Sequence, residues 1–119
     1  MNDRPVFSPG KNVAMKVPPH RFEETVAFYG NVLGFRELER EENGVVFAFG
    51  ESRRWIDRVP TVGHAELWLE GVTDDPVAAS DWLTSHGIAR CDGIERLPED
   101  FRGFWIANPA GIVHLVAGS

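Results

Sequence analysis

The sequence predicts an α+β fold built from two tandem modules, and two features of the chain support this. A strand, an amphipathic helix that ends at a glycine and three further strands occur twice along the 119 residues. Equivalent positions also keep nearly the same offset, since Gly34 and Gly87 are 53 residues apart and Asn12 and His64 are 52 apart. One such unit is too small to close a core, so we expect the modules to form one sheet system with both helices outside.

Length, charge and cysteine content limit the protein classes to be considered. A chain of 119 residues with 43% hydrophobic and 25% charged residues is typical of one soluble domain. The formal charge of −6 disfavours nucleic acid or an anionic membrane surface as a partner. A single cysteine, no apolar run near the roughly 18–20 residues of a membrane span and no secretory signal favour a cytoplasmic protein. We expect one domain over 1–119, with module one at about 11–60 and module two at about 61–119.

The first module is predicted from alternation and helical spacing. After a loop over residues 1–11, the segment Asn12–Val17 alternates as a strand, with Asn12, Ala14 and Lys16 on its less apolar face. A helical stripe and three further strands follow. The stripe consists of Phe22, Val26, Tyr29 and Leu33, and the helix ends at Gly34. The strands cover 35–41, 45–49 and 53–59. Trp55 and Asp57 share one face of the 53–59 strand.

The second module opens with a strand over residues 62–70. Leu67 and Leu69 lie on one face with Ala65, and we expect that face to pack against helices. The other face carries His64, Glu66, Trp68 and Glu70. These side chains either meet water, as one face of an antiparallel sheet often does, or line a ligand cavity.

The rest of the second module repeats the order of the first. Asp74 or Asp75 is the predicted N-cap of a helix that starts at Pro76 and stops at Gly87. The helix carries the stripe Ala79, Trp82, Leu83 and His86, and the later strands cover 88–94, 103–107 and 112–116, with a turn at 108–111 before the last. On the last strand we expect Val113 and Leu115 to form the core face and His114 to lie on the other face.

Three segments of this pattern resemble the vicinal-oxygen-chelate superfamily, which includes glyoxalase I, bleomycin-resistance proteins and extradiol dioxygenases. They are the helix end and stop at 26–35, the strand opening Gly63-His64-Ala65, and the turn Asn108-Pro109-Ala110-Gly111 followed by a strand. The resemblance implies tandem βαβββ modules that form a curved, partly open eight-stranded sheet around a ligand cavity, and it implies a homodimer.

The resemblance also implies metal ligands on the first and last strand of each module. At these positions the chain has Asn12, a residue of the 53–59 strand, His64 and His114. His64 matches the histidine of the family, His114 stands where glutamate is common, and Asp57 is the residue of the 53–59 strand able to bind a cation. Two histidines and one carboxylate would suit Fe(II), Mn(II), Zn(II) or Ni(II). The alternative is that both histidines are hydrogen-bonded cavity residues without a metal.

Other side chains of the expected cavity have candidate roles. Glu66 is two residues from His64 on the same face, and partial burial would adapt it to act as a general base; a salt bridge to Lys16 or an arginine is the alternative. Lys16 matches a position where glyoxalases carry a basic residue, or is a solvated lysine at a strand end. Trp55 and Trp68 would supply flat apolar walls for a substrate, and Asn12 would contact it.

Two functions of different classes follow. The first is a metal-dependent lyase, isomerase or dioxygenase that acts on a small oxygenated molecule. The second is a metal-free binding protein of the antibiotic-sequestering kind, which traps an aromatic or amphipathic ligand. His64 favours the first and Asn12 favours the second, because an amide is a poor metal ligand. The sequence has no phosphate-loop, dinucleotide-binding or nucleophile-elbow motif, so we expect no nucleotide cofactor.

Overall fold

The computed structural model of the chain describes residues 4–119, which form two compact units. Lys11–Trp68 makes up one unit, and Leu69–Ser119 with the segment up to Gly10 makes up the other. We call these the first and second unit and describe each separately. Within residues 4–119 no helix is long and apolar enough to cross a membrane.

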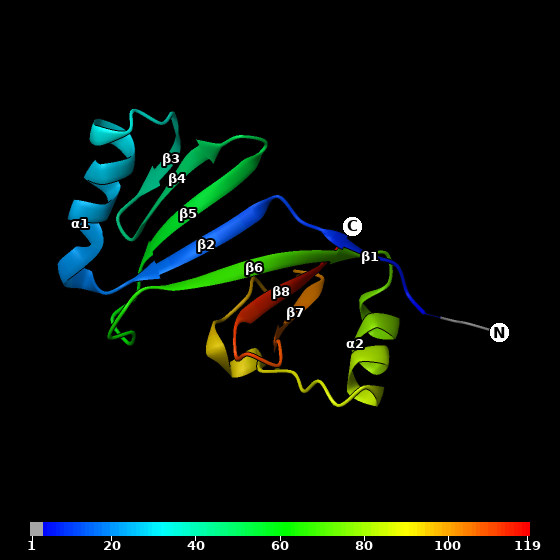
Figure 1. Cartoon of the computed structure of the whole chain (residues 1–119). Helices are drawn as coiled ribbons and strands as arrows, with labels where there is room; N and C mark the ends of the chain where they lie inside the picture. The colour runs from blue at the N-terminus through cyan, green and yellow to red at the C-terminus, as the bar shows by residue number, and fades with distance from the viewer. Residues whose placement is uncertain (1–3) are drawn as a thin grey trace. The chain divides into compact units, whose positions relative to one another are not determined.

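The first unit contains one helical segment and four strands of its own. In chain order these are β2 (Asn12–Val17), α1 (Pro19–Ala27), a π-helical segment η1 (Phe28–Val32), β3 (Glu37–Glu41), β4 (Gly44–Phe49) and β5 (Ser52–Arg58). The strands pair in the order β3-β4-β5-β2, with β2 and β5 parallel and the other pairs antiparallel. Helix α1 packs along one side of this sheet (Figure 1).

The core of the first unit lies between α1 and that side of the sheet. Phe22 and Val26 are one turn apart on α1, so both point to the strands. They form one buried cluster with Val17, Val45, Phe47 and Ile56, and these six residues have exposed fractions of 0–8%. We call this side of the sheet the helix face.

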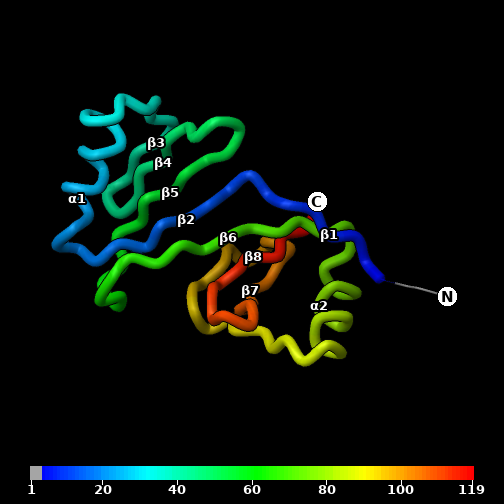
Figure 2. Tube along the Cα trace, in the orientation of Figure 1, coloured from blue at the N-terminus to red at the C-terminus, as the bar shows by residue number. Residues whose placement is uncertain are grey.

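The second unit is built around a shared strand. Its elements are β1 (Phe7–Pro9), β6 (Glu66–Thr73), α2 (Pro76–Ser85), a short 3-10 turn η2 (Asp92–Ile94), β7 (Gly103–Ala107) and β8 (Val113–Gly118). The last five residues of β6 pair with β8 and its first three with β2, so β6 belongs partly to each unit (Figure 2). Asp75 caps α2, because its side chain accepts a hydrogen bond from the amide of Ala78 at 3.1 Å. The core beneath α2 consists of Ala79, Phe104, Ile106 and Val116.

The predicted α+β class with its two βαβββ-type modules is confirmed, and the described residues contain eight strands. One strand differs from the prediction. Residues 88–94 form only an isolated bridge between Arg90 and Ile106, followed by η2. The reason is that the Asp92 side chain accepts the amide hydrogen of Trp105 at 3.1 Å and turns the chain away. The eighth strand is instead Phe7–Pro9, which pairs with β6 where a loop was predicted.

Helix α1 also differs from the single helix predicted as far as Leu33. The chain leaves α-helical geometry after Ala27 and makes one π-helical turn over Phe28–Val32. A π-turn holds more residues than an α-turn, so the 3.6-residue spacing no longer places later side chains on the core. Leu33, expected in the buried stripe, is 45% exposed.

The burial of β6 is the reverse of the prediction. Leu67 and Leu69 lie on the side expected to pack under helices, yet they are 44% and 38% exposed. Trp68, on the other side, is only 5% exposed. The strand begins at Glu66, so His64 lies in an exposed bend before it.

Candidate functional site

Six of the eight predicted site residues lie together on one face of the first unit's sheet, opposite α1. The register places Lys16 of β2 between Asp57 of β5 and Glu66 of β6, and Ala14 between Trp55 and Trp68. Cross-strand partners project from the same face, so these side chains are neighbours. We call this surface the polar face; its residues are Asn12, Lys16, Arg53, Trp55, Asp57, Glu66 and Trp68.

A buried ion pair lies at one end of the polar face. The ammonium group of Lys16 is 2.8 Å from Oδ2 of Asp57, and the Lys16 side chain is only 3% exposed while Asp57 is 20% exposed. A lone charge at this depth would lose its hydration without compensation, so each group depends on the other. Nζ of Lys16 also lies 4.3 Å from the ring centroid of Trp68, a cation–π distance.

Both tryptophans of the polar face use their indole nitrogen within it. Nε1 of Trp68 donates to Oε1 of Glu66 at 3.1 Å, two residues earlier on the same strand. Nε1 of Trp55 donates to Oδ1 of Asn12 at 2.8 Å across the parallel pair β2 and β5. These bonds fix the orientation of both rings, of which Trp55 is half-buried and Trp68 is buried.

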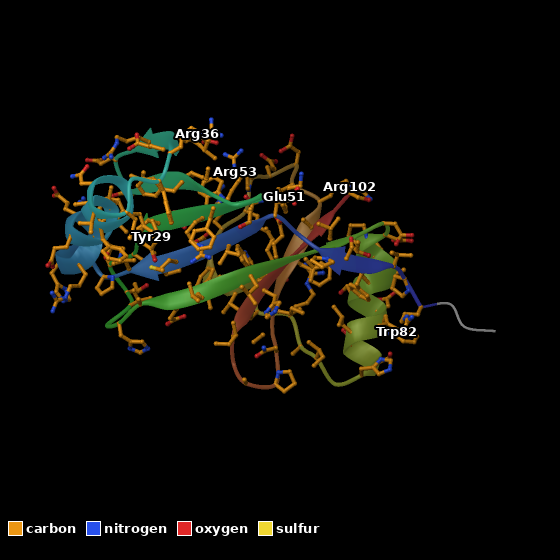
Figure 3. All side chains as sticks on the ribbon, turned by 45° about the horizontal axis from the view of Figure 1, so that its top comes forward. Tyr29, Arg36, Glu51, Arg53, Trp82 and Arg102 are labelled. Atoms are coloured by element: carbon orange, nitrogen blue, oxygen red, sulfur yellow. The ribbon has the colours of Figure 1, made fainter. Side chains whose placement is uncertain are left out.

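Arg53 is a member of the polar face that sequence reasoning missed. It lies opposite Asn12, pairs with Glu39 and has its guanidinium carbon 5.8 Å from the ring centroid of Trp55 (Figure 3). Its Nε is buried, with no hydrogen-bond partner in the described part of the chain. The signal was present in the sequence, because Arg53 precedes Trp55 by two residues and alternation puts both on one face.

Comparison with known proteins identifies the fold. No family model matches the sequence, and no curated protein sequence matches it. Among solved structures, the Mn(II)-bound glyoxalase from Novosphingobium aromaticivorans superposes with a TM-score of 0.65 at 17% identity, over 96% of this chain and 40% of that one. Methylmalonyl-CoA epimerase from Mycobacterium tuberculosis gives a TM-score of 0.67 at 15% identity, over 99% of this chain and 92% of that one.

A third similar structure is the E323L mutant of homoprotocatechuate 2,3-dioxygenase from Brevibacterium fuscum. Its TM-score is 0.65 at 15% identity, over 98% of this chain and 33% of that one. The chain has the vicinal-oxygen-chelate fold. It spans less than half the length of the glyoxalase and the dioxygenase, and at these identities the likeness establishes the fold alone.

In this fold His114 lies on the helix side of its strand. It follows the predicted turn at 108–111 and is opposite Ile106 in β7. Ile106 and Val116 pack beneath α2, and His114 shares their face. Leu115 is the residue that lies opposite Glu70, on the face away from the helix. The prediction that Val113 and Leu115 form the helix-packed face and His114 the other is therefore wrong.

The donor atoms of the predicted metal set do not fit a metal ion as they are arranged. A divalent cation needs several donors converging at about 2.0–2.3 Å. Among residues 4–119 no three His, Cys, Asp or Glu side chains form a group that could hold one. Oδ2 of Asp57 bonds to the Lys16 ammonium, and Oδ1 of Asn12 accepts the Trp55 hydrogen. Nδ1 of His114 lies 3.0 Å from the carbonyl oxygen of Ile112.

Proposed function

We propose that this protein binds a small aromatic or amphipathic molecule on the polar face of its first unit, without a metal ion. The observation that carries the proposal is the buried pair of Lys16 and Asp57 beside Trp68. An ion pair at this depth adds little stability relative to apolar side chains of the same volume, so a ligand-recognition role accounts for it better. The half-buried ring of Trp55 would stack on the ligand, and Glu66 and Asn12 would contact its polar atoms. The buried Trp68 and Lys16 would hold the carboxylates of Glu66 and Asp57 in place.

The competing function is a metal-dependent enzyme, namely a lyase, isomerase or dioxygenase. In that enzyme Glu66 would be the general base, and His64, His114 and Asp57 would bind Zn, Fe, Mn or Ni. One observation favours it: when the proton of His114 is on Nδ1, the contact with the Ile112 carbonyl leaves Nε2 as the acceptor nitrogen. The similar glyoxalase is a Mn(II)-bound protein, and the similar dioxygenase is an enzyme. The engagement of Asp57 with Lys16 is the reason to prefer the binding function.

Elemental analysis of protein purified without chelator distinguishes the two. The binding function expects sub-stoichiometric metal before and after soaking with Zn, Mn, Fe and Ni. Stoichiometric metal in the wild type that disappears in His64→Ala and His114→Ala would establish the competing function instead. A cytoplasmic location, a single domain and a homodimer complete the proposal.

Ligand binding is then measured by calorimetry with metal-free bleomycin as the probe, because the sequence resembles bleomycin-resistance proteins. We expect binding that EDTA leaves unchanged. Trp55→Phe should weaken it, because the substitution removes the indole that holds Asn12. Trp82→Phe is the matched control, since Trp82 is also half-buried but lies on α2 in the second unit. Equal weakening by both substitutions, or no binding at all, would count against the polar face.

A further inference from the structure

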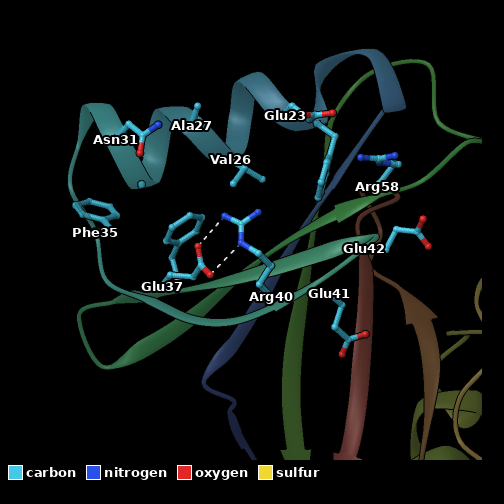
Figure 4. A pocket seen from close by; sticks show the side chains of 13 residues that line it. Glu23, Val26, Ala27, Asn31, Phe35, Glu37, Arg40, Glu41, Glu42 and Arg58 are labelled. Carbon is cyan, nitrogen blue, oxygen red and sulfur yellow. Dashed lines mark hydrogen bonds and ion pairs between the residues drawn. The ribbon is translucent and has the colours of Figure 1, made fainter.

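A pocket on the other side of the first unit's sheet is the strongest feature that the proposed function does not use. It has a volume of about 720 Å³ and lies between the helical segment α1–η1 and strands β3 and β4 (Figure 4). Small-molecule sites have volumes of about 300–1,000 Å³. The pocket lies on the helix face, because its floor residue Phe47 belongs to the α1 core. It is therefore separate from the polar face.

The pocket has an apolar floor and a charged mouth. Aromatic rings of Phe22, Phe35 and Phe47 line it together with Val26 and Ala27. The mouth carries four carboxylates and two guanidinium groups, a formal charge of −2, from Glu23, Glu37, Glu41, Glu42, Arg40 and Arg58. An apolar ligand body with a positive charge would match both parts.

The two arginines do not reverse the net negative charge of the mouth. Arg40 is bound by both oxygens of Glu37, with N···O distances of 3.0 and 2.7 Å, so its charge is already neutralised. That contact holds the pKa of the Glu37 carboxyl below its ordinary value, chiefly through the hydrogen bond from Arg40. The guanidinium of Arg58 lies 4.6 Å from the ring centroid of Phe22 and forms part of the wall. Within residues 4–119 Glu23, Glu41 and Glu42 have no ion pair.

The backbone beside the pocket keeps the space open. The π-turn over Phe28–Val32 brings Gly30 and Asn31 to the pocket wall, and such turns often occur at functional sites. A Cβ atom at Gly30 would lie 3.3 Å from the ring of Phe47, so the glycine allows a close approach of the helix to the floor without a shift of that ring. The last turns of α1 and η1 carry no basic residue, and the negative end of a helix favours a cation.

We propose that this pocket is a second ligand site, which binds a small organic cation with an apolar or aromatic body. The aromatic floor takes the body, and the carboxylates of the mouth take the charge. The small residues Ala27 and Gly30 line the wall and leave room for the ligand body.

A series of three probes that share the 2-phenylethyl group tests the charge preference. They are 2-phenylethylamine, 2-phenylethanol and 3-phenylpropanoate, which are a cation, a neutral molecule and an anion at pH 7. We expect the amine to bind about tenfold more tightly than the alcohol and the anion most weakly, with the affinity for the amine falling as salt is added. Binding of the anion as tight as that of the cation, or no binding of the amine at millimolar concentration, would overturn the proposal.

Two neighbouring glutamates on α1 give a matched pair of variants. Glu23 lines the pocket, whereas Glu24 does not and pairs with Arg21 at 3.1 Å on the exposed side. Glu23→Gln should weaken binding of the amine about threefold, and Glu24→Gln should leave it unchanged. Ala27→Phe should abolish binding by filling the pocket. Equal effects of the two glutamine variants would contradict the proposed position.

Amide and indole resonances separate this site from the proposed function. The amine should shift the backbone amides of Gly30 and Asn31 and leave the indole resonances of Trp55 and Trp68 in place. A shift of the indoles without a shift at Gly30 would assign the probe to the polar face and overturn the second site. Failure of bleomycin to bind would leave the pocket result standing, because the two surfaces are read by different resonances.

Discussion

At the scale of single residues, the polar face depends on one buried charge and its partner. Lys16 is 3% exposed and bonded to Asp57 at 2.8 Å. Removing one member of such a pair leaves the other charge buried without compensation, whereas removing both restores an apolar contact. We therefore expect a large loss in the free energy of unfolding only when one member of the pair is replaced and the other is kept.

We predict that Asp57→Asn lowers the free energy of unfolding by about 3 kcal/mol, at the lower end of values for buried pairs because Asp57 is 20% exposed. Urea unfolding measures it. The double variant Lys16→Met with Asp57→Leu should lose clearly less unfolding free energy than the sum of the losses of Lys16→Met and Asp57→Leu measured singly. Glu24→Gln is the control. The side chains of Arg21 and Glu24 are 63% and 68% exposed, so their ion pair should contribute nothing measurable to stability. An Asp57→Asn variant as stable as that control would mean that the ammonium does not need its partner.

At the scale of elements, the turn η2 replaces a predicted strand, and Asp92 holds it. Oδ1 accepts the amide hydrogen of Trp105 in β7 at 3.1 Å, and Oδ2 accepts from Nε of Arg90 at 2.7 Å. Burial alone would raise the pKa of Asp92, but the hydrogen bonds from Trp105 and Arg90 outweigh it and hold the pKa below the ordinary 3.8. A lowered folded pKa stabilises the fold above the unfolded value, and this contribution is lost as the pH falls through the folded pKa.

We expect Asp92→Asn to lose about 1 kcal/mol of unfolding free energy near neutral pH, a small value because the carboxylate is 46% exposed. The difference from wild type should shrink as the pH falls below about 4, where the native carboxylate takes up its proton. Urea titrations at pH 7 and pH 3 measure this, with Asp81→Asn on the exposed side of α2 as the control. A difference that stays constant across that range would exclude a role for the Asp92 charge.

The elements also show how far the sequence could predict the structure. Strand Asn12–Val17 has its predicted bounds, because period-2 alternation with Pro18 after it leaves no other register. The face of His114 could not be predicted, since apolar residues on both sides of Val113–Gly118 make its alternation ambiguous. The exposed Leu67 and Leu69 show a second limit: alternation assigns a side chain to a face but does not say how far a helix covers that face.

The sequence predicted most residues of the polar face but not the pocket beside α1. Alternation predicted Glu66 and Trp68, and the family resemblance added Lys16 and Asp57. The register brings all four together on one face. The pocket beside α1 was not predicted, because it depends on the π-turn after Ala27. A π-turn leaves no clear pattern in the sequence, so its effect appears only when the helix packs.

At the scale of the whole molecule, the remaining expectation is a homodimer. The sequence argument was that bare sheet edges require covering. The outer strand of the first unit weakens that argument, because β3 carries Glu37, Glu39, Arg40 and Glu41, and charges on an edge oppose pairing with another strand. Exposed apolar side chains now support the dimer better. Phe28, Val32 and Leu33 at the end of the first helical segment are 46%, 72% and 45% exposed.

We therefore predict a dimer at micromolar concentration that uses this helix end and that light scattering detects. Val32→Lys should convert it to a monomer, because an ammonium group buried in an apolar contact loses its hydration. Val77→Lys is the matched control: Val77 is 74% exposed on α2, in the second unit, and its substitution should leave the dimer intact. A monomeric wild type would end the dimer proposal. A dimer that survives Val32→Lys but not Val77→Lys would move the contact to the second unit.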